Sequence, residues 1–302
     1  MPNIYTVEKD YENLRFDKWF KIKIIKLPQS LIEKILRLNK VKINKKKIKS
    51  SYRVQSGDKI EIFDISKFKP LDRPKTIKYK PSRKEINSYN DYIIEDNKNF
   101  IVINKPAGVP VQSGTKSFKN IIDILKDSKY FLDQKPYIVH RLDKDTSGIL
   151  IIAKNRAYAQ LFTSLFRIRK IHKTYIAISH GAINRNISVL KDDLITYDNG
   201  KKLVQKAITN IKVIKSNDKF SFVELNPVTG RKHQLRKQLH IIGSPIVGDN
   251  KYYFKNYINR KKTKANNLLL HAYKIKFMIN NVKYNFKAKY EIFFENFLKK
   301  NF

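Results

Sequence analysis

Residues 140–148 read HRLDKDTSG, and residues 149–153 continue as ILIIA. The residues after Gly148 carry no polar side chain, which predicts a short strand buried on both faces. The polar residues before it are typical of a tight turn, because Asp and Ser oxygens accept hydrogen bonds from nearby backbone N–H groups. A carboxylate at the mouth of a sheet is equally well placed to meet a substrate. These residues alone therefore leave a turn and a reactive site open for Asp143.

Further strands and helices surround this segment along the chain. Apolar runs predict strands at 100–104, 148–153, 174–179, 204–214 and 220–225. Asn155 can cap a helix whose apolar stripe comprises Ala157, Leu161, Leu165 and Ile168. A second helix at 232–242 ends before Gly243. Because the strands do not alternate regularly with helices, we expect an α+β domain over 91–302 with a mainly antiparallel sheet.

The preceding residues predict a smaller domain over 13–66. Apolar side chains at helical spacing indicate two helices, with Phe16, Trp19 and Phe20 in the first and Leu31, Ile35 and Leu38 in the second. Alternating apolar and basic residues at 41–44 and 47–49 predict a hairpin, which a strand at 59–63 follows. Residues 67–90 contain prolines among polar residues and lack periodicity, which predicts a linker.

The composition excludes several classes of protein. The chain has 302 residues, and its 41% apolar content is ample for packed cores. The absence of cysteine excludes disulfides, thiolate catalysis and cysteine zinc sites. No apolar run reaches the ~18 residues of a membrane span, and residues 1–11 lack the apolar stretch of a secretory signal. We therefore expect a soluble, cytoplasmic protein with no membrane partner.

The charge of the chain indicates a polyanionic partner. Its 64 Lys and Arg residues against 26 Asp and Glu residues give a net charge of +38, which favours nucleic acid. AT-rich codons would also enrich Lys, Asn, Ile and Tyr, so a solvated lysine surface is the alternative. No acidic residue occurs between residues 34 and 57, and this local concentration favours binding. Its central part, the basic patch, comprises Lys45, Lys46, Lys47, Lys49 and Arg53.

The segment at 140–148 resembles the signature of the RluA-type pseudouridine synthases. Other segments resemble motifs of that family in the same order, at 104–108, 173–177, 206–209, 227–236, 248–249 and 270–272. Residues 14–19, 41–49 and 56–60 resemble an S4 RNA-binding domain. The resemblance covers nearly the whole chain. It implies a small S4-like RNA-binding domain and then a pseudouridine synthase domain, whose mainly antiparallel mixed sheet is flanked by helices.

The resemblance also implies roles for individual residues. Pseudouridine formation breaks the N1–C1′ bond of uridine and rejoins the uracil through C5. Asp143 would attack C1′ or take a proton from the ribose, and both routes stay open. Tyr175 would stack on the uracil and help remove the C5 proton, while Arg236 would pair with Asp143. Arg141 would hold the space left by the flipped uridine, and Arg231 would contact phosphate or anchor the fold.

No metal or cofactor is implied by this reaction. We therefore expect His140, His233 and His240 to have structural or RNA-contact roles rather than to bind a metal. The basic patch of the S4-like domain would contact RNA phosphates. RNA is thus the expected partner, and we expect the protein to be a monomer.

The order of S4-like domain, linker and catalytic domain favours large-subunit ribosomal RNA, or a precursor particle, as the substrate. A pseudouridine synthase acting on transfer RNA is one alternative. A non-catalytic RNA-binding assembly factor is another, although it would not need Asp143, Tyr175 and Arg236 together. A glycoside hydrolase is disfavoured, because Asp143 and Asp145 lie on one turn and have no obvious way to flank a glycosidic bond.

Overall fold

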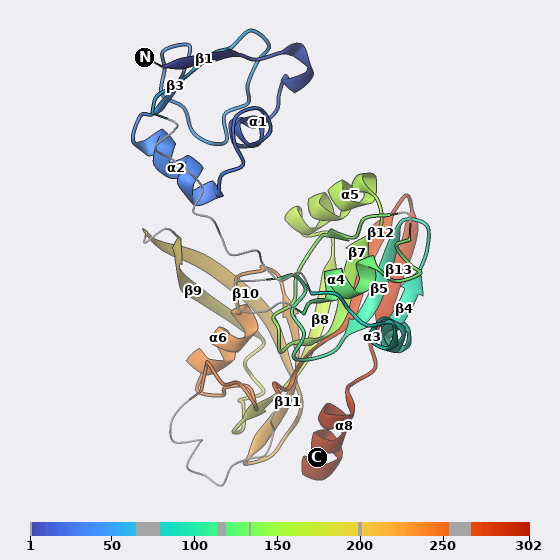
Figure 1. The fold of residues 1–302 in the computed structure, drawn as a ribbon. Coiled ribbons are helices and arrows are strands. Elements are labelled where there is room, and N and C mark those ends of the chain that lie inside the picture. Colours follow the sequence, from blue (N-terminus) through green and yellow to red (C-terminus); the bar gives the residue numbers. More distant parts are fainter. Residues whose placement is uncertain (1, 65–78, 114–118, 133, 199–200, 254–266) are drawn as a thin grey trace. The chain divides into compact units, whose positions relative to one another are not determined.

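The computed structural model describes residues 2–64, 79–113, 119–132, 134–198, 201–253 and 267–302. Its contacts divide the chain into two compact units, residues 1–77 and 78–302. Figure 1 shows the helices and strands of each unit. Within the described ranges, no helix is long and apolar enough to cross a membrane.

The first unit combines a three-stranded antiparallel sheet with two α-helices. Its elements are β1 (Asn3–Thr6), the 3-10 helix η1 (Lys9–Tyr11), α1 (Phe16–Lys23), α2 (Gln29–Arg37), β2 (Val41–Ile43) and β3 (Lys59–Ile62). Strand β3 lies between β1 and β2. Phe16, Trp19 and Phe20 of α1 are buried in one core with Ile32 and Ile35 of α2, so the face predicted for the first helix is confirmed.

The structure of this unit differs from the sequence-based predictions in three places. Leu38 is 49% exposed, because α2 ends at Arg37 and turns Ile32, Ile35 and Leu36 inward. Residues 47–49 form no strand, and β2 pairs with β3 instead. Strand β1 precedes the predicted domain start at residue 13. Its pairing with β3 joins segments more than 50 residues apart, which local patterns do not reveal.

Part of the predicted linker is folded. Residues 67–78 lie outside the described residues, but α3 (Arg83–Ser88) begins within the predicted linker and the 3-10 helix η3 (Tyr89–Tyr92) follows it. The Ser82 hydroxyl caps α3 by accepting a hydrogen bond from the Glu85 backbone N–H at 3.2 Å. Tyr89 is buried in a core of the second unit. Residues 79–90 therefore belong to the second unit rather than to a linker.

The second unit is built on a ten-stranded mixed sheet. Its strands are β4 (Ile93–Asp96), β5 (Phe100–Lys105), β6 (Tyr137–Ile138), β7 (Ser147–Ala153), β8 (His172–His180), β9 (Val189–Asp198), β10 (Lys201–Ser216), β11 (Phe220–Pro227), β12 (Leu270–Ile279) and β13 (Val282–Lys287). The strand order is β4-β5-β7-β12-β8-β11-β10-β9, with β13 beside β12 and β6 beside β7. Only β7 and β12 pair in parallel among the described strands. The prediction of a mainly antiparallel mixed sheet is confirmed, although β4, β6, β9, β12 and β13 were not predicted.

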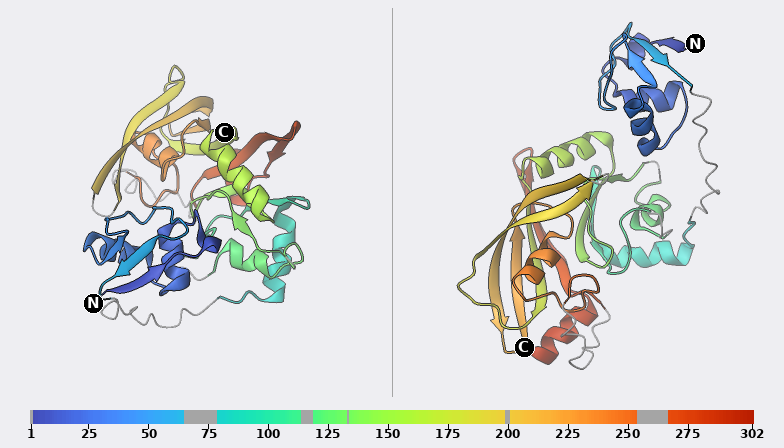
Figure 2. Two further views of the ribbon diagram at one scale, coloured as in Figure 1. Left: turned by 90° about the horizontal axis from the view of Figure 1, so that it is seen from above. Right: turned by 90° about the vertical axis from the view of Figure 1, so that its left-hand side faces the viewer.

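Helices flank this sheet, as expected. They are α4 (Ile121–Lys126), α5 (Arg156–Arg167), α6 (Gln234–Ile241) and α8 (Ile292–Asn301). Figure 2 shows them from two further directions. Asn155 caps α5 as predicted, since its side chain accepts a hydrogen bond from the Tyr158 backbone N–H at 2.9 Å. The predicted stripe of α5 is confirmed in part: Leu161 and Leu165 pack against the core, where Phe162 is the fully buried residue of the helix. Ala157 and Ile168 are exposed instead.

Strand β7, which ends the segment quoted from the sequence, is buried along its whole length. Leu150 and Ile152 belong to the core on the α4 side, whereas Ile149 and Ile151 pack with Phe162 of α5 on the other side. This alternation is the geometry of a strand with a helix layer on each face. Burial on both faces, as predicted, holds the start of β7 rigidly beside the preceding loop.

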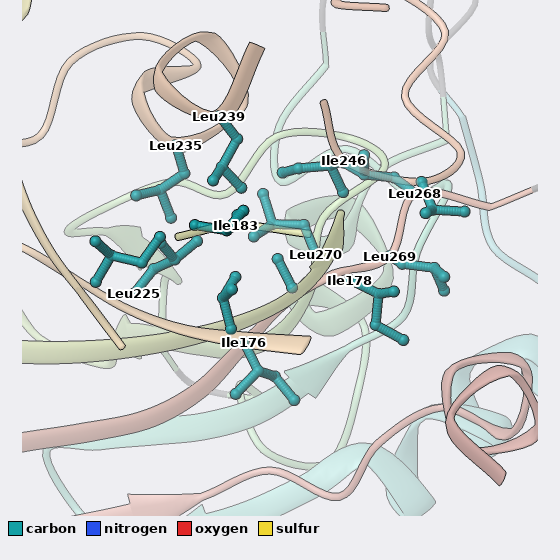
Figure 3. Packing of buried hydrophobic residues seen from close by; sticks show 14 of the residues in the cluster. Ile176, Ile178, Ile183, Leu225, Leu235, Leu239, Ile246, Leu268, Leu269 and Leu270 are labelled. Carbon is teal, nitrogen blue, oxygen red and sulfur yellow. The ribbon is translucent and has the colours of Figure 1, made fainter. Parts of the chain in front are cut away.

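Helices α6 and α8 cover opposite faces of the sheet around β11. The ring of Phe222 packs against Phe294 of α8. Leu225, three residues further along β11, points to the other face and shares a core with Leu235 and Leu239 of α6, as Figure 3 shows. The packing of these leucines fixes α6 against the sheet and thereby positions the N-terminal end of the helix.

Gly148 lets the backbones of β7 and β12 come together. It pairs with Ala272 in the parallel ladder and has a φ of +105°. A Cβ at this position would lie within 3 Å of three backbone atoms of Ala272. Only glycine fits this close approach, and the conformation is one that other residues rarely adopt.

We expect Gly148→Ala to lower the free energy of unfolding by about 3 kcal/mol or more, because backbone strain and a steric clash combine. Gly243→Ala is the matched control, since Gly243 also has positive φ but a Cβ added there would meet no atom within 4 Å. It should lose only about 1 kcal/mol. Urea unfolding followed by circular dichroism measures both. Equal losses would contradict a role for the close contact with Ala272.

Candidate active site

A cavity of about 890 Å³ opens in the second unit beside the loop that precedes β7. The loop, β8, the end of β11 and the start of α6 supply its walls. The lining includes the five residues of this unit predicted from the sequence to be catalytic or substrate-binding, Arg141, Asp143, Tyr175, Arg231 and Arg236. The sequence therefore identified residues from separate elements that the fold brings together.

Buried hydrogen bonds of Lys105 hold the Asp143 loop. The side chain of Lys105 is fully buried, and its Nζ donates hydrogen bonds to the backbone oxygens of Pro106, Val109 and Lys144 at 2.8–3.0 Å. The Gly108 backbone N–H also donates to the Lys144 oxygen, at 3.0 Å. Burial lowers the pKa of Lys105 to about 7. These bonds attach the residue after Asp143 to the end of β5.

His140 fixes the other end of the loop. Its Nε2 accepts a hydrogen bond from the Ile151 backbone N–H at 2.9 Å, and its ring packs on Phe166. Burial, together with the charge of Lys173, lowers the pKa of His140 to about 3, so the ring is neutral at neutral pH. A neutral ring can accept the Ile151 hydrogen bond, which agrees with the structural role expected for His140. Among the described residues, no group of metal-ligating side chains is present.

Arg236 has a different main partner from the one predicted. Its Nε and Nη2 donate to the two carboxylate oxygens of Asp249 at 2.7 and 2.8 Å, with both side chains almost fully buried. Burial alone would lower the pKa of Arg236, but the hydrogen bonds and charge of Asp249 raise it overall. Burial would likewise raise the pKa of Asp249, but its bonds to Arg236 and to two backbone N–H groups lower it. The pair is a bidentate hydrogen-bonded contact between two oppositely charged groups.

Asp143 lies beside this pair with its carboxylate 27% exposed. The Nη1 of Arg236 is 3.5 Å from its Oδ2, and the Nε2 of His233 is 3.6 Å from its Oδ1. Both distances are long for charged hydrogen bonds. Asp143 thus faces Arg236 as predicted, but it shares the guanidinium with Asp249 and keeps an open side toward the cavity.

Tyr175 lies on β8, where the sequence predicted it, and its ring is another wall of the cavity. It pairs across the sheet with Leu225 and with Ala272. Burial, with the charge of Asp143, raises the pKa of Tyr175, so the phenol is protonated at neutral pH. An aromatic ring with an intact hydroxyl therefore lies near the carboxylate.

The remaining predicted residues lie partly at the cavity and partly in the first unit. Arg141 is exposed at the cavity, while Leu142 is buried in the core as expected. Arg231 is half-buried and its Nε donates to the Lys206 backbone oxygen at 3.1 Å, which ties it to β10. The basic patch belongs to the first unit, and all its side chains are exposed: Lys45, Lys46, Lys47, Lys49 and Arg53.

Sequence reasoning missed the parts played by Asp249, His233 and Lys173. Asp249 was noted only within the family-like pair at 248–249, and no pattern linked it to Arg236. No pattern indicated that His233 faces Asp143 either. Lys173 lines the cavity, and burial lowers its pKa. Lys173 lies two residues before Tyr175 on β8, so both side chains lie on the same face of the sheet. This spacing is the signal that could have identified Lys173.

Most of the chain is similar to known proteins. Residues 99–240 match the family model for RNA pseudouridylate synthases. The chain is 38% identical over 278 residues to ribosomal large subunit pseudouridine synthase C of Rickettsia conorii, covering 85% of this chain and 88% of the relative. The corresponding protein of Buchnera aphidicola subsp. Baizongia pistaciae is 34% identical over 284 residues, covering 90% and 88%. The solved structure of human RNA pseudouridylate synthase domain containing 4 superposes with a TM-score of 0.61 at 28% identity, covering 71% of this chain and 94% of that one.

The two carboxylates near Arg236 should differ in their effect on stability. Asp249→Asn leaves a buried guanidinium without its counter-charge and should lower the free energy of unfolding by about 3–5 kcal/mol. Asp143→Asn removes a partly exposed, longer contact and should lower it by less than about 1 kcal/mol. Urea denaturation compares the two variants. Similar losses would mean that Asp143 is as much a structural partner of Arg236 as Asp249 is.

Proposed function

The chain belongs to the RluA-type pseudouridine synthase family, and from this membership we propose that it isomerises specific uridines of large-subunit ribosomal RNA. Relatives named as ribosomal large subunit pseudouridine synthase C support this target, because their similarity extends over 85–90% of the chain. Because ribosomal RNA is the proposed substrate, we propose that the enzyme acts in the cytoplasm. We propose that it acts as a monomer.

The observation that carries the catalytic part of the proposal is the placing of Asp143 against Arg236 in a cavity that Tyr175 also lines. Isomerisation of uridine needs a group that acts at the ribose and later leaves it. An ionised carboxylate with one open side meets both requirements, either as a nucleophile at C1′ or as a base toward the sugar. We therefore assign that step to Asp143, with Arg236 as the cation that orients it.

Tyr175 would hold the uracil while its glycosidic bond is broken. Its ring offers a stacking surface for a base, and stacking suits a uracil that must turn over before it is rejoined. The raised pKa of Tyr175 leaves its hydroxyl protonated at rest, so the phenol acts first as a hydrogen-bond donor. Removal of the C5 proton by this oxygen would have to follow the loss of its own proton.

Two arginines at the cavity would deal with the surrounding RNA. Arg141 is exposed next to Asp143, which suits a side chain that occupies the space vacated by a flipped uridine. Arg231 is tied through its Nε to β10, and its terminal nitrogens are the atoms available for a phosphate. We propose these roles for the two residues.

For the first unit we propose an S4-like RNA-binding function. Its basic patch is exposed, and Lys45 of the patch forms a turn with Asn44 in which both residues have positive φ. Lysines on such a turn contact phosphates without reading bases. This unit would therefore add affinity for RNA and leave the chemistry to the second unit.

We expect Asp143→Asn to reduce pseudouridine formation at least ~1000-fold and to leave RNA affinity within about twofold, because the amide keeps the shape of the carboxylate but not its reactivity. Asp218→Asn, the same change at an exposed turn, is the control and should keep full activity. Purified enzyme on ribosomal RNA transcripts provides the rate. Full activity of the Asp143→Asn enzyme would refute the assignment.

The target is tested by mapping pseudouridines in cellular RNA with and without the protein. We expect sites to disappear from large-subunit ribosomal RNA. Loss from transfer RNA alone would overturn the proposed substrate, and an unchanged map of all RNA would favour a non-catalytic assembly factor.

Replacing Lys45, Lys46, Lys47 and Lys49 together by Gln should weaken RNA binding and reduce its salt dependence by up to about four units of slope, because fewer counterions are released. At saturating RNA the single-turnover rate should stay at the wild-type value. A control with Gln at four other exposed lysines of the first unit should change the slope less, at Lys9, Lys18, Lys26 and Lys59. Equal slopes for the two variants would mean that the patch is ordinary solvated surface.

A further inference from the structure

His233 has an unusual backbone conformation at the entrance to α6. It is the N-cap residue of that helix, with φ 55° and ψ 31° in the left-handed region, and its side chain makes no capping hydrogen bond. A left-handed conformation is strained for a non-glycine residue. Such strain persists where the surroundings require one side-chain direction. Here that direction brings the imidazole to Asp143.

Both ring nitrogens of His233 have a defined neighbour. Nε2 lies 3.6 Å from the Asp143 Oδ1, and Nδ1 lies 2.9 Å from the hydroxyl oxygen of Tyr252. The side chain is only 15% exposed, so water has little access to replace these contacts. The imidazole therefore bridges a tyrosine hydroxyl and the proposed catalytic carboxylate.

These neighbours select one tautomer of the neutral ring. A carboxylate only accepts hydrogen bonds, so an Nε2 lone pair facing Asp143 would be repelled. A tyrosine hydroxyl can donate or accept, and it adapts to either form. The favoured arrangement has the proton on Nε2, while the Tyr252 hydroxyl donates to Nδ1.

Tyr252 also contacts the other partner of Asp143. The Arg236 guanidinium lies over its ring, with 5.3 Å between the guanidinium carbon and the ring centroid. Its backbone N–H donates to the Asp249 Oδ1 at 2.9 Å, the same carboxylate that binds Arg236. A single residue thus supports both side chains that face Asp143.

We propose that Tyr252 and His233 are positioning residues, which act together with Arg236 to fix the plane of the Asp143 carboxylate. His233 faces one oxygen and Arg236 the other, and Tyr252 sets the tautomer of the first and the place of the second. The distances of 3.5 and 3.6 Å shorten to hydrogen bonds when RNA fills the cavity and excludes water. This inference rests on the proposed role of Asp143.

Tyr252→Phe is the sharpest test, because it keeps the ring beneath Arg236 and removes only the hydroxyl. We expect the single-turnover rate at saturating RNA to fall about tenfold while RNA affinity stays unchanged, as expected for loss of one hydrogen bond at a reacting group. Tyr253→Phe, the same change at the next and more exposed tyrosine, should keep the wild-type rate. A wild-type rate for Tyr252→Phe would overturn the proposal.

A double-mutant comparison separates this role from general stabilisation. His233→Phe removes the imidazole, and His233→Gln retains a side-chain N–H that can face Asp143. We expect the Gln variant to be faster than the Phe variant. Because the Tyr252 hydroxyl acts through His233, adding Tyr252→Phe to His233→Phe should slow the enzyme little further. Effects that multiply in full would show two independent structural roles and contradict the proposal.

Nuclear magnetic resonance tests the tautomer without relying on activity. Nitrogen-15 shifts of the His233 ring, assigned by comparison with His233→Gln, should show the proton on Nε2 in the wild type and a mixture in Tyr252→Phe. A wild-type ring protonated on Nδ1 would overturn the inference even if the enzyme is active. If instead Asp143→Asn stayed active while the tautomer was as expected, the proposed function of Asp143 would fail and the His233–Tyr252 contact would stand.

Discussion

The buried ion pair between Arg236 and Asp249 is the constraint on which the proposed site depends. Asp249 engages Nε and Nη2 of the guanidinium, which leaves Nη1 as the nitrogen that faces Asp143. Asp249 also accepts hydrogen bonds from the backbone N–H groups of Lys251 and Tyr252. The pair therefore links the first turn of α6 to the segment after it, and a displacement of either charge would move the guanidinium that faces Asp143.

Local patterns were sufficient wherever a residue's position follows from its own element. The apolar run at 148–153 predicted β7 because a strand buried on both faces has no polar side chains. Tyr175 was placed on a strand, and the helix carrying Arg236 was predicted to within two residues at its start and one at its end. For these elements, periodicity and end signals outweigh the effect of distant contacts.

Contacts between distant segments were not predictable in this way. The partner of Arg236 is 13 residues away across a turn, and nothing in the spacing distinguishes Asp249 from the acidic residues at the surface. His233 was expected to be structural or to contact RNA, because its approach to Asp143 depends on a left-handed backbone. Strands β1 and β12 were missed for a related reason, since each is defined by a partner far along the chain.

The parallel pairing of β7 with β12 also sets when the enzyme becomes competent during synthesis. Ser147 and His271, which pair in that ladder, are 124 residues apart. At translation rates of roughly 5–20 residues per second, the loop bearing Asp143 leaves the ribosome about 6–25 s before the strand that backs it. The nascent chain thus carries an exposed edge of β7 through that interval, and the first unit has time to fold while the second is still incomplete.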